Sequence, residues 1–245
     1  MKPVYETHWL NSQFHTLFRV NHTGRIIREN DPDRSPGPLF WLGGSADGNL
    51  IGISADLPDS LAATLTRIAA SEPPFVHPAM PEHLADYEAQ LQGYGNGEHS
   101  LSITWRLPHD HPYSSRATLV SSESEEGQRL ATEWAQEGLP QGLCELGFAS
   151  VADLWTPWCA AMAGNDVASL AFAARLSHTG AELGLATVGE FRGQGFGAAA
   201  TAGWSRLNAL RSRTLFYNTS RDNISSQRVT ERLMLSACGA GLRFT

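Results

Sequence analysis

Cysteine is scarce in this chain of 245 residues, which carries only Cys144, Cys159 and Cys238 and no CxxC pair. An odd number of thiols without paired spacing is typical of neither a disulfide framework nor a cysteine-based zinc site. A chain of this length buries a sizeable core without cross-links, so we expect all three cysteines to be buried structural thiols.

Long hydrophobic runs are also missing from the sequence. No segment approaches the roughly 18 apolar residues that a membrane-spanning helix needs, and the start MKPVYETHWLNSQF lacks the basic and apolar regions of a signal peptide. The hydrophobic share of 42% and the seven Trp residues are ordinary for a globular protein. The sequence therefore predicts a soluble cytoplasmic protein without membrane contact.

Basic residues are in deficit, with 18 Lys and Arg against 25 Asp and Glu and a formal net charge of -7. Nucleic-acid binding draws much of its affinity from Lys and Arg that neutralise phosphates, so we do not expect it here. An acidic surface suits a cationic small molecule better, although such steering acts mainly on association rates.

Metal-ligating side chains are present but poorly spaced. The run HDH at 109–111 stands alone, and His8, His15 and His22 recur every seven residues without a carboxylate or cysteine partner at ligand spacing. We therefore expect no metal site.

The first 115 residues predict a region of strands, turns and helices. Residues 17–30 alternate loosely, and residues 38–58 contain two apolar runs around the turn-forming GGSADGN, which predicts a hairpin. A helix is expected over Asp59–Ala70, before Pro73 and Pro74, and a second over Glu82–Gln92. The alternating run SLSITWRLP then predicts a strand.

Residues 116–245 begin with the pattern of a capped helix. The run SSESEEGQRLATEWAQEG has Ser and Glu at its start and Leu130 and Trp134 on one face. The runs LWTPWCAAM, VASLAFAARL and AELGLATV predict an antiparallel meander. An alanine-rich helix over 197–213, a strand LFYNTS and a last helix over 222–235 are expected to follow.

The most informative stretch is VGEFRGQGFGA at 188–198, where a strand ends, a glycine-rich turn follows and a helix begins. Glycines let the backbone approach a ligand closely, and the free N–H groups at a helix start suit phosphate oxygens. Arg192 adds a positive side chain. A dinucleotide site is the alternative, but it requires a parallel βαβ context instead of a preceding meander.

This stretch resembles the acetyl-CoA motif of the GNAT superfamily of N-acetyltransferases, in which Arg or Gln is followed by two residues, Gly, one residue, and Gly or Ala. Arg192, Gly195 and Gly197 fit each position. With the flanking elements, the resemblance covers about residues 150 to 235. It implies an α/β (α+β) GNAT fold, a mixed and mostly antiparallel sheet flanked by helices, over residues 116–245. Residues 1–115 form an extra N-terminal α+β region.

The resemblance also implies a cofactor site. Thr187 and Val188 would pair with the pantetheine arm of acetyl-CoA, and Asn223 and Ser226 match cofactor-side positions on the last helix. Asn223 suits a helix N-cap equally well. The backbone amides that would hold the pyrophosphate belong to Gly193, Gln194, Gly195, Phe196, Gly197 and Ala198.

The catalytic residues are less clear from the sequence. Glu182 resembles a strand glutamate that acts as general base in some GNAT enzymes, and a solvated carboxylate is the alternative. The tyrosine that many members use as general acid is replaced by Thr230. Tyr217 and Ser225 are the nearest substitutes, although Tyr217 also suits a core position. The arginines Arg221, Arg228 and Arg232 share one face of the last helix, where they meet either cofactor phosphates or solvent.

From these residues we expect an acetyl-CoA-dependent transfer of an acetyl group to a primary amine of a small-molecule acceptor. A noncatalytic acyl-CoA binding module is the alternative. After the last helix only GLRFT remains, where the family adds two strands, so we expect the N-terminal region or a second subunit of a homodimer to cover that edge. An uncovered edge at Arg243 would contradict this. The N-terminal region would shape the acceptor pocket or be a degenerate second lobe.

Overall fold

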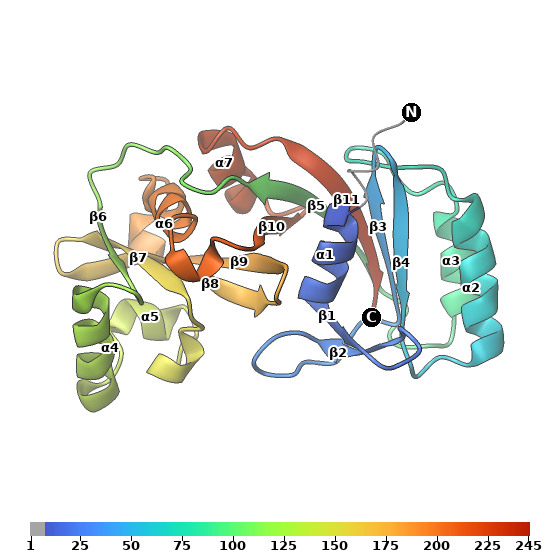
Figure 1. Cartoon of the computed structure of the whole chain (residues 1–245), viewed down its shortest axis with the longest axis horizontal. Helices are drawn as coiled ribbons and strands as arrows, with labels where there is room; N and C mark the ends of the chain where they lie inside the picture. Colours follow the sequence, from blue (N-terminus) through green and yellow to red (C-terminus); the bar gives the residue numbers. More distant parts are fainter. Residues whose placement is uncertain (1–7) are drawn as a thin grey trace. The chain divides into compact units, whose positions relative to one another are not determined.

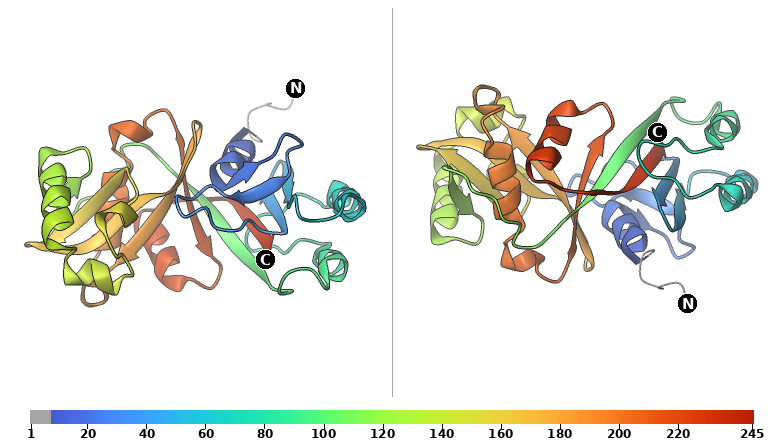
Figure 2. Two further views of the ribbon diagram at one scale, coloured as in Figure 1. Left: turned by 90° about the horizontal axis from the view of Figure 1, so that it is seen from below. Right: turned by 90° about the horizontal axis from the view of Figure 1, so that it is seen from above.

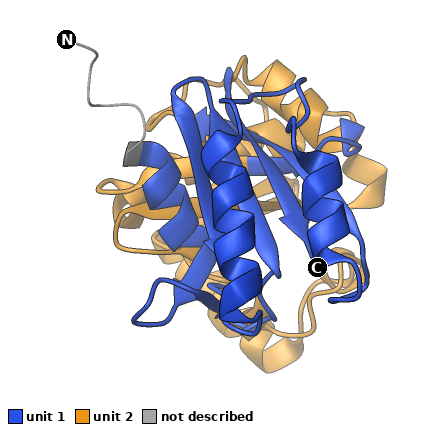
Figure 3. Cartoon of the chain, turned by 90° about the vertical axis from the view of Figure 1, so that its right-hand side faces the viewer, with its two compact units in different colours: residues 1–106, 218–224, 236–245 blue, residues 107–217, 225–235 orange. Residues whose placement is uncertain are grey.

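The computed structural model describes residues 8–245, which form two compact units (Figures 1 and 3). The first unit contains the chain up to Arg106 together with residues 218–224 and 236–245, and the second contains residues 107–217 and 225–235. The units are therefore not continuous segments that divide at residue 115, because two late segments return to the first unit.

The first unit contains a four-stranded antiparallel sheet in the order β4-β3-β11-β5 and a separate β1-β2 hairpin. In Figure 2 the helices α2 and α3 lie side by side in both views. The elements are α1 (His8–Leu17), β1 (Phe18–Val20), β2 (Ile26–Glu29), β3 (Phe40–Ser45), β4 (Gly48–Ile53), α2 (Asp59–Ser71), α3 (Leu84–Leu91), β5 (His99–Leu107) and β11 (Ala237–Phe244).

The sequence predicted most of these elements. The hairpin β3-β4 and the helix α2 lie where they were expected, and Leu65 on the predicted face of α2 is fully buried. Helix α1 was not predicted, although Leu10, Phe14 and Leu17 are buried at helical spacing. Helix α3 is shorter than the expected Glu82–Gln92, because the backbone N–H groups of Glu82 and His83 are bound by the buried carboxylate of Glu72.

The last strand, β11, lies between two strands from the N-terminal region. Arg243 pairs with Trp41 of β3 on one side and with Ser100 of β5 on the other. The expectation that the N-terminal region covers this edge is confirmed. The strand begins at Ala237, earlier than the GLRFT tail indicated, because the preceding helix ends at Arg232 instead of Leu235.

The second unit contains a sheet in the order β10-β9-β8-β7-β6, antiparallel except for the parallel pair β9 and β10. Short 3-10 turns complete the unit at 151–153, 189–191 and 208–210. The main elements are β6 (Thr118–Ser121), α4 (Glu125–Glu137), α5 (Gln141–Glu145), β7 (Trp158–Ala163), β8 (Asp166–Leu176), β9 (Gly180–Thr187), α6 (Phe196–Trp204), β10 (Thr214–Ser220) and α7 (Ile224–Arg232).

The predicted meander is confirmed as β7, β8 and β9. The helix α4 starts as expected, with the side chain of Ser124 accepting a hydrogen bond from Gly127 N and with Trp134 buried. The alanine-rich helix α6 stops at Trp204 instead of continuing to 213, and every residue from Gly197 to Trp204 is buried. Although β9, α6 and β10 form one parallel crossover, the antiparallel strands before it are not those of a dinucleotide-binding fold.

None of the helices in the described part of the chain is long and apolar enough to cross a membrane.

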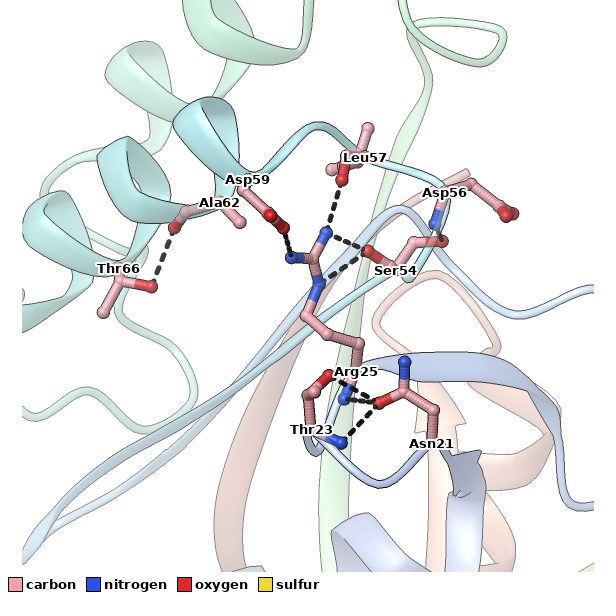
Figure 4. A network of polar contacts seen from close by, with 9 residues as sticks. All are labelled: Asn21, Thr23, Arg25, Ser54, Asp56, Leu57, Asp59, Ala62 and Thr66. Atoms are coloured by element: carbon pink, nitrogen blue, oxygen red, sulfur yellow. Dashed lines mark hydrogen bonds and ion pairs between the residues drawn. The ribbon is translucent and has the colours of Figure 1, made fainter.

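The side chain of Arg25 joins the β1-β2 turn to the segment between β4 and α2 (Figure 4). Its Nε and Nη2 donate to the carbonyl of Ser54 at 2.8 and 2.5 Å, and Nη2 donates to the carbonyl of Leu57 at 2.6 Å. The Arg25 side chain is 17% exposed, whereas its ion-pair partner Asp59 is fully exposed. The carbonyl bonds therefore matter more than the ion pair.

We expect Arg25→Met to lower the free energy of unfolding by about 2 kcal/mol, because hydrogen bonds to a charged donor are lost and carbonyls are left unpaired. Asp59→Asn removes only an exposed ion pair and should cost less than about 1 kcal/mol. Urea unfolding followed by Trp fluorescence measures both. Equal effects of the two substitutions would contradict this account.

Candidate functional site

The parallel ladder between β9 and β10 is short. It pairs Thr214 with Gly180, Leu215 with Ala181 and Phe216 with Glu182, while β9 continues to Thr187. On its other side β9 stays paired with β8 as far as Ser169 and Thr187. Beyond Glu182, one edge of β9 therefore has no strand partner among the described residues.

The open edge of β9 carries backbone polar groups. The N–H of Val188 donates to the carbonyl of Ala168, so residue 188 faces β8. Because such groups alternate along a strand, the N–H and carbonyl groups of Leu185 and Thr187 face the opposite, open side. That side can bind an extended ligand in the way that a sheet binds an added strand.

The glycine-rich turn leads directly from this edge into α6. Gly193 and Gly195 have φ angles of +76° and +95°, a region that side chains disfavour. The first bond of the helix runs from Ala199 N to Gly195 O at 3.0 Å. Within the described chain, the backbone N–H groups of residues 193–198 have no hydrogen-bond acceptor. Six successive N–H groups without an acceptor at a helix start have the geometry that can bind an anion.

Two arginines and a tyrosine surround the turn. Arg192 Nε donates to the carbonyl of Thr187 at 3.3 Å, and Arg232 Nη2 donates to the carbonyl of Gly193 at 3.3 Å. A Cβ atom on Gly195 would lie 3.0 Å from both Arg232 Nη1 and the hydroxyl of Tyr113. Gly195 is therefore required by its φ angle and by its neighbours.

Tyr113 was not found by the sequence analysis. It lies in the turn-like segment HDHPYSS, where no spacing or motif connects it to a glycine loop far along the chain. The hydrophobic cluster that contains Ala198, Ala202 and Leu233 brings its ring to the loop.

The three arginines near the last helix have different surroundings. Arg232 borders the glycine turn, and Arg228 is exposed on the same helix. Arg221 donates to the carbonyl of Pro78 at 2.8 Å and contacts the sulfur of Met80, and it belongs to the first unit. The expectation that Arg221 shares one helix face with the other two is wrong, because it precedes the helix and binds the 78–80 loop.

The backbone of Val188 is less available to a ligand than expected. Its N–H donates to Ala168 O, and its carbonyl accepts from Phe191 N. The Thr187 hydroxyl forms a 2.9 Å hydrogen bond with Ser169 Oγ. The N–H of Thr187 is therefore the group best placed for a pantetheine arm.

The remaining loop residues set the position of α6. A Cβ atom on Gly197 would lie 3.2 Å from Thr187 Oγ1, so the glycine lets the helix start close to the strand end. Phe196 packs edge-on against Phe191 with ring centroids 5.6 Å apart. The Gln194 side chain donates to the carbonyl of Glu190 at 2.8 Å, which closes the turn on its outer side.

Glu182 lies at the last rung of the β9-β10 ladder and is only 6% exposed. Its carboxylate forms an ion pair with Arg175 of β8. A bulge between Ala173 and Arg175 places Arg175 opposite Glu182. The alternative of a solvated carboxylate at this position is therefore wrong.

The expected residues of the last helix have separate environments. Asn223 is exposed and directly precedes α7, which is the position of an N-cap. Tyr217 is 3% exposed. Burial raises the pKa of Tyr217, and the side chain of Ser226 opposes that rise. Thr230 is buried and donates to the carbonyl of Gln227 at 2.7 Å.

The histidines of the HDH run are held by the backbone around them. His109 Nε2 donates to the carbonyl of Arg213 at 2.9 Å, and His111 is 8% exposed. Among residues 8–245, no group of three or more His, Cys, Asp or Glu side chains could hold a metal ion.

The order of elements in the second unit decides its fold. Antiparallel strands lead to a glycine loop, a buried crossover helix, a parallel strand and a last helix. The second unit has the expected class of fold, a mixed and mostly antiparallel sheet flanked by helices.

Comparisons with known proteins give distant likenesses. No protein-family model and no curated protein matches the sequence. Three similar solved structures are a GNAT-family acetyltransferase from Colwellia psychrerythraea and GCN5-related N-acetyltransferase proteins from Streptococcus suis and Kribbella flavida. Their identities are 12%, 14% and 16%, and their TM-scores are 0.41, 0.42 and 0.40.

The extent of these likenesses varies. The matches cover 100%, 84% and 66% of this chain and 98%, 84% and 64% of the Colwellia, Streptococcus and Kribbella chains, respectively. At these identities and TM-scores the likenesses carry no argument about this chain, and its fold is described from its own strand order.

The cysteines do not contribute a nucleophile to this site. Cys159 is buried, and burial raises its pKa to about 12. Contrary to the expectation that all three thiols are buried, Cys144 is exposed on the outer side of α5 and Cys238 is only partly buried.

We expect iodoacetamide at pH 8 to alkylate Cys144 well before Cys159 in the folded protein. A thiol with a raised pKa stays protonated until the pH approaches that value, and the thiol is the unreactive form. Peptide mass spectrometry after timed labelling measures both rates. Equal labelling of Cys159 under native conditions would contradict the prediction.

Proposed function

We propose that this protein is an acetyl-CoA-dependent N-acetyltransferase that moves an acetyl group directly to a primary amine of a small-molecule acceptor. The observation that carries the proposal is the row of free N–H groups at 193–198, which follows the open edge of β9. A phosphate group and an extended amide-bearing arm both find donors in this arrangement.

The residues present fit acetyl-CoA. The loop N–H groups would bind the pyrophosphate oxygens, and the arginines Arg192 and Arg232 would add positive charge beside them. Leu185 and Thr187 would hydrogen-bond the pantetheine amides along the open edge. Acetyl-CoA supplies the activated thioester when it is bound.

Glu182 is our choice for the general base. An ammonium must lose a proton before its nitrogen attacks a thioester carbonyl, and a carboxylate beside the arm would take that proton. The ion pair with Arg175 holds the carboxylate in one place. No covalent intermediate on the protein is proposed, because the buried thiol of Cys159 stays protonated.

A second candidate function is a noncatalytic module that binds acyl-CoA. The observation that favours it is Thr230, which stands where many GNAT enzymes have an acid and is buried with its hydroxyl bound to Gln227 O. The hydroxyl that stays protonated near the ladder end is that of Tyr217, because burial raises its pKa.

We further propose a cytoplasmic location, a function that needs no metal, nucleic acid or membrane, and a homodimer as one assembly to be tested. The net charge of -7 supports a cationic acceptor.

We expect Gly195→Glu to weaken acetyl-CoA binding on the order of a hundredfold, because a side chain there displaces Arg232 and Tyr113 and misdirects the loop donors. Gly193→Ala is the matched control, since its φ is also positive but its Cβ atom would meet nothing within 4 Å. Calorimetric titration measures both. Unchanged binding in Gly195→Glu would overturn the assignment of the cofactor site.

We expect Glu182→Gln to reduce kcat roughly a hundredfold or more while the Kd for acetyl-CoA stays within about twofold, because a general base acts on the chemical step. Glu190→Gln, beside the same loop but exposed, is the control. Thiol release with a panel of amines measures turnover. Acetyl-CoA binding without amine-dependent thiol release in the parent protein would favour the noncatalytic module.

A further inference from the structure

A pocket of about 330 Å³ lies in the first unit, where the end of α3 meets the end of β11. Leu39, Leu91 and Phe244 form its apolar part, and the last two are each only 2% exposed. Glu88 and Tyr94 also line it. We call it the α3 pocket. A concave apolar surface with a few polar groups is typical of a site for a small molecule.

The glycine-rich loop that follows α3 keeps this pocket open. Asn96 N donates to the carbonyl of Thr245 at 3.2 Å, and Thr245 N donates to the carbonyl of Glu98 at 3.2 Å. Gly93 and Gly97 both line the pocket, with φ angles of +88° and +72°, and a Cβ atom on either would meet nothing within 4 Å. The loop is therefore tied to the end of β11, while its glycines leave the space beside it unfilled.

The charge around the α3 pocket favours a cation. Among the described residues that line it, Glu88 alone has a charged side chain. The last turn of α3 contains no basic residue, so no side chain there balances the partial negative charge of the helix C-terminus. The ring of Tyr94 is 37% exposed and offers an aromatic face that attracts cations.

His99 holds Glu88 through one of its two carboxylate oxygens. His99 Nδ1 lies 3.2 Å from Glu88 Oε1, and the Glu88 side chain is 47% exposed. The imidazole also packs beside the ring of Phe244, with ring centroids 5.5 Å apart. The carboxylate is thus kept near the apolar part of the pocket, and Oε2 is left to accept a hydrogen bond from a ligand.

We propose that the α3 pocket binds a small organic ammonium ion with an apolar body, such as an arylalkylamine. The apolar body contacts Leu39, Leu91 and Phe244, and the ammonium group pairs with Glu88 beside the ring of Tyr94. A carboxylate in the same place would face the like charge of Glu88. The proposal does not depend on the proposed function, because all these residues belong to the first unit and none is in the cofactor site.

The first test compares probes that share a phenylethyl group and differ in charge, namely phenethylamine, 2-phenylethanol and 3-phenylpropionate. In the 15N-labelled protein we expect millimolar phenethylamine to shift the backbone amide resonances of Gly93 and Gly97. The neutral 2-phenylethanol should bind about tenfold more weakly, because it keeps the apolar contacts and loses the ion pair. The anionic 3-phenylpropionate should cause no shift.

The second test removes the charge of the pocket. Glu88→Gln should weaken phenethylamine binding about tenfold and leave 2-phenylethanol binding within about twofold, which also shows that the pocket is still folded. Asp86→Asn is the matched control. It makes the same change of charge on α3, but Asp86 pairs with His83 and does not line the pocket. This variant should bind both probes as the parent does.

A third variant separates a ligand role of Glu88 from a structural one. His99→Phe removes the ion pair with Glu88 but keeps a ring beside Phe244 and the carboxylate in the pocket. It should bind phenethylamine at least as tightly as the parent protein, to within about twofold. Equal losses in Glu88→Gln and His99→Phe would overturn the proposal, because Glu88 would then act only by holding His99.

Three further results would overturn the proposal. These are equal binding of 3-phenylpropionate and phenethylamine, no shift with phenethylamine at millimolar concentrations, and equal effects of Asp86→Asn and Glu88→Gln. No acetyl-CoA is added in any of these titrations. A failure of the cofactor assignment would therefore leave their outcome unchanged.

Discussion

The candidate site depends on where the parallel ladder between β9 and β10 stops. Paired strands lie about 4.8 Å apart and leave no room for a ligand between them. Once pairing ends after Glu182 and Phe216, the backbone groups on that side of β9 face no strand. From Leu183 to Thr187, β9 stays paired with β8 in regular register, so these groups form a regular row. An open edge forms on β9 because its pairing with β10 ends while its pairing with β8 continues.

Small residues then set the start of α6 at the end of this row. Gly197 packs against the Thr187 hydroxyl, and a Cβ atom on Gly203 would lie 2.5 Å from Cys159 Sγ. Both ends of the helix are therefore pressed against neighbouring strands. The glycines allow this close packing, and the backbone N–H groups of the loop are the hydrogen-bond donors. For this reason the sequence indicates the site through the spacing of its glycines more than through reactive side chains.

Much of the second unit follows from local patterns. The alternation of β7 to β9, the Ser124 cap and the glycine loop are each encoded within about ten residues, so the sequence alone predicts them. The helix α1 carries a helical pattern that was missed. Features that depend on contacts between distant residues could not be predicted from the sequence, such as the bulge that turns Arg175 toward Glu182. Tyr113 reaches the loop, and Arg221 leaves the helix face, through contacts with segments that no spacing connects.

The position of β11 has a consequence for how the chain becomes a folded protein. Leu42 of β3 pairs with Leu242 of β11, and β11 separates β3 from β5. During synthesis the ribosome completes β3 and β5 long before it reaches β11. Until β11 is made, the edges of β3 and β5 that pair with it have no strand partner. Bare edges of this kind invite pairing with other chains, and contacts between distant residues form slowly. Most of the first unit is synthesised first, but its sheet is completed last. A truncation or disruptive substitution near the C-terminus would therefore destabilise the N-terminal half of the chain.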